Sequence, residues 1–61
     1  MTLTIPAADL HPGDIIHTPN WDEHVVRAEP DVRGIAVVVR EFPDLILHYP
    51  LGASLSVERA T

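Results

Sequence analysis

Apolar and polar residues alternate along most of the chain with a period of two, the pattern of strands that bury one face. Leu3 and Ile5 alternate with threonines, and this first strand ends at Pro6, which lacks the N–H that a sheet needs. The clearest strand is predicted over 34–41, because β-branched residues dominate it. Only residues 7–10 suit a helical turn, which is too short to be stable alone. The remaining predicted strands cover residues 14–18, 24–29, 45–49 and 55–59.

These segments follow one another at spacings of about 8 to 12 residues, which is typical of a sandwich or a barrel. A flat sheet this small would expose one face and two edges, whereas a curled sheet hides one face in its interior. We therefore predict an all-β protein, a small closed or partly open SH3-like barrel of about five to six short antiparallel strands. Residues 1–61 are expected to form a single domain, because a chain of this length has room for one core. Three large rings near strand ends are expected to plug the ends of the barrel: Trp21, Phe42 and Tyr49.

The stretch LHPGD, residues 10–14, has the composition of a sharp corner. Pro12 and Gly13 suit the two central positions of a type II turn, since proline presets its φ angle and glycine accepts a positive one. Asp14 follows with a side chain short enough to accept hydrogen bonds from nearby backbone N–H groups. We assign a structural role in this corner to Leu10, Pro12, Gly13, Asp14 and Trp21.

The pattern ADLHPGDII…W…VVRAEPDVRGIAVVV…LILHYP…SVER resembles short, mostly uncharacterised proteins of actinobacteria and their phages. Those proteins open with a Leu-x-Pro-Gly-Asp corner, continue through a tryptophan and valine-rich strands, and close with a Pro-containing turn and a short strand. The same corner opens strands in self-splicing Hint domains, whose nucleophile and histidines have no counterpart here. The resemblance implies a small barrel of bacterial or phage origin, and it assigns no active-site residue.

Several predicted strands carry apolar residues on both faces, unlike strands with one solvated face. The runs are 15–16, 35–39 and 45–47. One set fills the interior, and the other needs a cover, because large apolar patches are rare on monomers. The loops 18–23 and 49–54 and a protein partner stay open as alternatives for that cover. The residues assigned to this outer, interacting face are Ile15, Val25, Ala36, Val38 and Ile46. The sequence does not decide which face of each strand is buried and which is exposed, so the two sets of residues can be exchanged.

The net charge of −5 and the absence of cysteine narrow the functional classes. A negative field repels phosphate backbones and anionic lipid. The longest apolar run is far shorter than the about 20 residues that span a bilayer, and the opening segment lacks the basic start and apolar core of a signal peptide. The acids fall mostly at turns, and Ser54 and Ser56 lack the glycines of a nucleophile elbow. We predict a non-catalytic protein-interaction or structural module of the cytoplasm that forms a homodimer or binds another protein, with no cofactor and no membrane or nucleic-acid partner.

A histidine metal site is one alternative. His17 and His24 flank the loop 18–23, so hairpin pairing would bring them close. Together with Asp22 or Glu23 they would supply the nitrogen and oxygen ligands that zinc accepts. Their spacing matches no specific metal-binding motif.

A nucleic-acid-associated regulatory barrel is the second alternative, since small barrels bind single strands through basic grooves and aromatic platforms. The residues that it would use are Arg27, Arg33, Arg40 and Trp21. Pairing with Glu29, Asp31 or Glu41 across the hairpin is the expected role of these arginines, because acids surround them.

Overall fold

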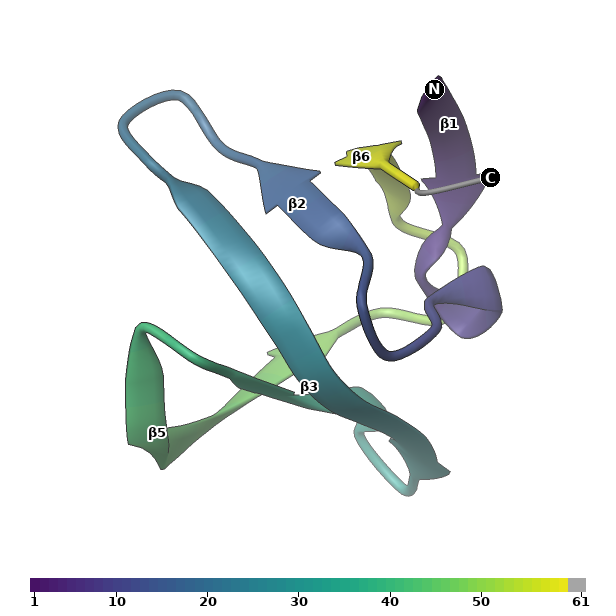
Figure 1. Ribbon diagram of the computed structural model, residues 1–61. Coiled ribbons are helices and arrows are strands. Elements are labelled where there is room, and N and C mark those ends of the chain that lie inside the picture. The colour runs from purple at the N-terminus through teal and green to yellow at the C-terminus, as the bar shows by residue number, and fades with distance from the viewer. Residues whose placement is uncertain (60–61) are drawn as a thin grey trace.

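The computed structural model describes residues 1–59, which are built almost wholly of strands (Figure 1). The elements are β1 Thr2–Pro6, the 3-10 helix η1 Ala7–Asp9, β2 Ile15–His17, β3 Asp22–Asp31, β4 Gly34–Val39, β5 Phe42–Tyr49 and β6 Ser54–Glu58. The all-β prediction is confirmed, and the short helical turn lies where the sequence places it. The last two residues of the predicted domain, 60 and 61, lie outside the described residues.

The strands pair antiparallel in one sheet with the order β1-β6-β2-β3-β4-β5. Within residues 1–59 the edge strands β1 and β5 do not pair with each other, so the sheet is not closed into a barrel. Proline occurs in both edges, at Pro6 and Pro43, and each proline removes a donor that closure would use. The long β3 pairs with β2 near its start and with β4 farther along, and Figure 1 shows it running from the loop after β2 to the turn before β4.

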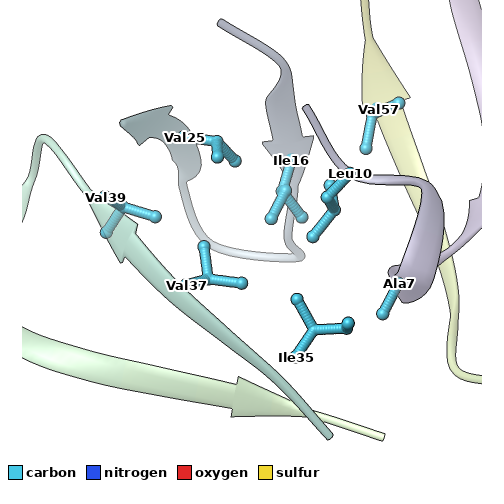
Figure 2. Packing of buried hydrophobic residues seen from close by; sticks show 8 residues of the cluster. All are labelled: Ala7, Leu10, Ile16, Val25, Ile35, Val37, Val39 and Val57. Carbon is cyan, nitrogen blue, oxygen red and sulfur yellow. The ribbon is translucent and has the colours of Figure 1, made fainter. Parts of the chain in front are cut away.

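The curved sheet wraps one apolar core. In Figure 2, side chains from β4 point toward those from β2, β6 and the segment around η1. Along β4 the faces alternate, with Ile35, Val37 and Val39 buried and Ala36 and Val38 half-buried on the other side. The buried cluster consists of Ala7, Leu10, Ile16, Val25, Ile35, Val37, Val39 and Val57. The question of which face of each strand is buried is therefore resolved.

A β-bulge in β3 explains one wrong prediction, the placement of Val25 on the outer face. Val25 is only 4% exposed and lies opposite the buried Val39. The register shifts between Val25 and Arg27, so that Arg27 lies opposite the outward-facing Val38. Because directly opposed residues point to the same side of a sheet, the bulge reverses the alternation. Val25 and Arg27 are two positions apart, so regular alternation would place them on the same face, yet they lie on opposite faces.

The LHPGD segment forms the predicted corner. The Asp14 N–H donates to the His11 carbonyl at 3.1 Å, and Gly13 has φ of 95°, so Pro12 and Gly13 occupy a tight turn of the expected kind. Leu10 inserts into the core. Trp21 does not belong to this corner, because it lies at the β2–β3 loop and is tied to Thr18 by hydrogen bonds.

Asp14 is the buried polar centre of the corner, with 2% of its surface exposed. Its carboxylate accepts from Arg59 Nε at 2.9 Å, from Arg59 Nη2 at 2.7 Å and from the His11 N–H at 2.9 Å. Arg59 Nη2 also donates to the Asp9 carbonyl at 3.0 Å. The ion pair therefore fastens the residue after β6 to a corner that is 45 residues earlier in the chain.

Candidate functional site

The outer face of β3, β4 and β5 carries an apolar strip. Val38 lies opposite Ile46, and Ala36 lies two pairs farther along β4, opposite His48. Ala36 and Val38 are half-buried, whereas Ile46 is 58% exposed. The surface is hollowed here, and we call this depression the outer hollow; it is lined by Arg27, Glu29, Pro30, Asp31, Ala36, Val38 and Ile46. The structure thus brings together three of the residues that the sequence assigns to an interacting face.

The other two assigned residues lie elsewhere. Val25 is part of the core, as described above. Ile15 is half-buried on β2, where it lies opposite His24 on one side and Glu58 on the other. Neither residue lines the outer hollow.

Charged residues of both signs form the rim of the outer hollow. Arg27 Nη2 and Glu29 Oε1 are 2.7 Å apart. Asp31 accepts from the Arg33 N–H at 2.7 Å and contacts His48 Nε2 at 2.9 Å. The Arg33 N–H above all, and then the His48 ring, hold the pKa of Asp31 below its usual value against an opposing effect of desolvation.

The arginines do not share one surface role. Arg27 pairs with Glu29 along β3 itself and not across the hairpin as expected, whereas Arg33 binds Asp31 through its main-chain N–H. Arg40 donates its main-chain N–H to the His24 carbonyl at 2.8 Å. The indole N–H of Trp21 donates to Glu23 at 3.1 Å.

Three histidines pair with three separate carboxylates. His17 Nδ1 lies 2.9 Å from Asp22 Oδ1, and His24 Nδ1 contacts Glu41 Oε2. The β2–β3 register is the reason, since it sets Asp22 opposite His17 and Ile15 opposite His24. In residues 1–59 no three His, Cys, Asp or Glu side chains converge as metal ligands. The structure therefore does not assemble the zinc site that His17 and His24 would have formed. The His24 main-chain N–H, at 2.7 Å, and then the His24 ring lower the pKa of Glu41.

A second cluster surrounds the buried Glu23, which is 4% exposed. Trp21 Nε1 donates to Glu23 Oε2 at 3.1 Å, and the Tyr49 hydroxyl donates to Glu23 Oε1 at 2.8 Å. Burial, and then the neighbouring Glu23, raise the pKa of Tyr49 to about 12. The Trp21 ring also meets Phe42 edge to face, with centroids 6.3 Å apart. Glu23 is not one of the acids at turns that the sequence predicts, because its position two residues before Val25 on β3 faces inward.

In comparisons with protein-family models, curated proteins and solved structures, nothing matched this chain. The helical part of residues 1–59 is a single 3-10 turn, and no helix there is long and apolar enough to cross a membrane. The functional assignment therefore depends on the geometry of these surfaces alone.

Proposed function

We propose that this protein is a non-catalytic interaction module that pairs with a second copy of itself through the outer hollow and the adjoining edge of β5. The observation that carries the proposal is the exposed apolar strip on an edge strand. Ile46 is 58% exposed beside the half-buried Val38, and Leu45 is exposed on the same strand. Exposed apolar side chains beside an open edge are features that proteins otherwise cover or avoid.

The open edge adds main-chain affinity to the apolar strip. β5 pairs with β4 on one side only, so its other side presents unpaired N–H and C=O groups. A partner strand that binds such an edge gains a ladder of backbone hydrogen bonds. Pro43 lies at the start of β5, so the segment that can pair fully is 45–49.

The rim of the outer hollow suits a second copy of the chain. It holds Arg27 and Glu29 side by side, so a two-fold axis would set the arginine of one protomer near the glutamate of the other. A partner with one sign of charge would meet repulsion from one of the two residues. An apolar centre with a polar rim is the usual composition of a protein interface.

We also propose that the fold is a partly open, SH3-like barrel, because a curved six-stranded sheet around one core is compatible with that architecture. We also place the protein in the cytoplasm of a bacterium or in a phage-infected cell, consistent with the resemblance carried by LHPGD and with a composition without cysteine.

Sedimentation equilibrium over micromolar to millimolar protein tests the proposal. We expect the apparent mass to rise from monomer to dimer with concentration, and Ile46→Lys to shift this rise to higher concentration by about tenfold or more. Leu51→Lys is the matched control, because Leu51 is 55% exposed, close to the 58% of Ile46, but lies in the β5–β6 turn. A wild-type protein that stays monomeric throughout, or an equal effect of both substitutions, would refute the pairing through β5.

A further inference from the structure

Two aromatic rings lie exposed at one end of the curved sheet. Trp21, from the β2–β3 loop, is 50% exposed, and Phe42, at the start of β5, is 42% exposed. They meet edge to face although they are far apart in sequence. Exposed aromatic pairs of this kind are enriched at binding surfaces, because large rings bury much area at little cost in side-chain entropy.

Trp21 is held in a fixed orientation. Its main-chain N–H donates to Thr18 Oγ1 at 3.1 Å, and its carbonyl accepts from the Thr18 N–H at 2.9 Å. Its indole N–H is bound to the buried Glu23. The ring is therefore pre-organised, and its one polar donor is already used inside the molecule. The exposed part of the indole offers a ligand only carbon and its π surface, which favour apolar and cationic groups over anions.

A small surface hollow adjoins Phe42, and we call it the acidic hollow. It is lined by Glu41, Phe42, Pro43, Asp44 and Leu45. The register shift opposite Val39 produces it, because residues 43–45 leave the regular ladder between the Phe42 and Ile46 pairs. Its apolar lining is flanked by the carboxylates of Asp44 and Glu41, and Glu41 also accepts from the His24 N–H and contacts the His24 ring. This arrangement suits an alkyl chain that ends in a positive charge.

The charge around this end is negative. Glu23 is buried and accepts from two neutral donors, and no ion pair joins it to a cation within residues 1–59. Asp22 follows Trp21, and Asp44 lies two residues after Phe42. Arg40 is the nearby cation in sequence, at the β4–β5 turn, and the whole chain carries −5. A cationic partner is therefore attracted to this end, and an anionic one is repelled.

We propose that the acidic hollow, together with Trp21, binds an arginine or lysine side chain from a basic segment of a partner protein. The alkyl stem packs on Phe42 and Leu45 while the charged group lies between the Glu41 and Asp44 carboxylates and the aromatic faces. The site shares Leu45 with the β5 edge of the proposed dimer, whereas Trp21, Phe42 and Asp44 lie outside both the outer hollow and the segment 45–49.

The single tryptophan of the chain makes the site directly observable. We would titrate the protein with a blocked peptide in which arginines alternate with glycines, following Trp21 fluorescence and the NMR signal of its indole N–H. A peptide of the same length with citrulline keeps the shape but loses the charge. We expect saturable changes with the arginine peptide, affinity at least about tenfold weaker with citrulline, and further weakening by salt.

Two substitutions separate a site from general charge attraction. Asp44→Asn removes a carboxylate of the acidic hollow, and Asp9→Asn removes one exposed carboxylate at η1, so both change the net charge equally. We expect Asp44→Asn to weaken arginine-peptide binding several-fold and Asp9→Asn to leave it unchanged. Equal effects of the two variants, equal binding of arginine and citrulline peptides, or no change at Trp21 would each overturn the proposal. The titrations use a protein concentration at which sedimentation shows a monomer, so these results are separate from the test of the dimer.

Discussion

The ion pair of Asp14 and Arg59 offers a sharp test of whether the LHPGD corner is structural. Asp14→Asn keeps the size of the side chain but removes its charge. The native carboxylate accepts three hydrogen bonds, two of them from the guanidinium at 2.9 and 2.7 Å. The amide has a single acceptor oxygen, so it keeps at most part of this set.

The expected loss follows from the burial of Asp14. Breaking a buried ion pair by removing one partner costs about 3–5 kcal/mol. Here the Arg59 side chain is 28% exposed, so water solvates the guanidinium that is left behind and reduces the cost. We expect Asp14→Asn to lower the free energy of unfolding by about 2 kcal/mol. A domain of this size has only about 3–5 kcal/mol in total, and its melting temperature would fall by about 10 °C or more.

Urea unfolding followed by Trp21 fluorescence measures this change, with slopes compared between variants to check that the transition remains two-state. Arg59→Met completes a double-mutant cycle, in which the double variant should be less destabilised than the sum of the two single variants. A loss below about 0.5 kcal/mol for Asp14→Asn, the range of ordinary surface substitutions, would refute the structural reading of the corner. Strict additivity in the cycle would refute the coupling to Arg59.

Three further predictions concern acid stability, the β3–β4 turn and the buried carboxylate. The hydrogen bond from Arg59 lowers the pKa of Asp14 in the folded protein. Ionised Asp14 therefore stabilises the fold above the unfolded pKa near 3.9, and this contribution is lost as pH falls through the lower folded pKa. Thermal melts from pH 7 to pH 2 should show a decline in melting temperature that is less steep in Asp14→Asn. Gly34→Ala should destabilise by about 2 kcal/mol or more in urea unfolding, because Gly34 has φ of 126° and a Cβ would overlap the Tyr49 carbonyl oxygen; Gly52→Ala, which meets nothing within 4 Å, should change little. Tyr49→Phe should cost about 1–2 kcal/mol by leaving Glu23 one donor short, and absorbance titration of the single tyrosine should give a pKa of about 12; a midpoint near 10 would show that the hydroxyl is solvated.

Local pattern accounts for most of the fold. Alternation located the strands, and the Pro12–Gly13 pair located the first turn, because both signals depend only on neighbouring residues. The alternation of apolar and polar residues does not reveal register shifts between strands. β5 begins at Phe42 rather than at 45 because the shift opposite Val39 lets Phe42 pair early, and the β3 bulge moved Val25 inward. Closure also depends on how the two edges meet in space, which alternation does not report.

The surfaces were predicted less completely for the same reason. Ala36, Val38 and Ile46 were found from apolar runs, and the structure places them together. Arg59 and Glu23 were missed as structural groups, because their partners are distant in sequence: 45 residues separate Arg59 from Asp14, and 26 separate Glu23 from Tyr49. The resemblance to actinobacterial and phage proteins stays a prediction.

The two edges of the open sheet differ, and this difference limits how many copies of the protein can assemble through them. If β1 of one molecule joined β5 of the next, each addition would leave a fresh edge, and the chain of copies would lengthen into a filament. Contact of β5 with another β5 stops at two molecules. Pro6 ends β1 and has no N–H to donate, so it weakens the pairing of β1 with β5 of another molecule. In this way it protects against the formation of filaments.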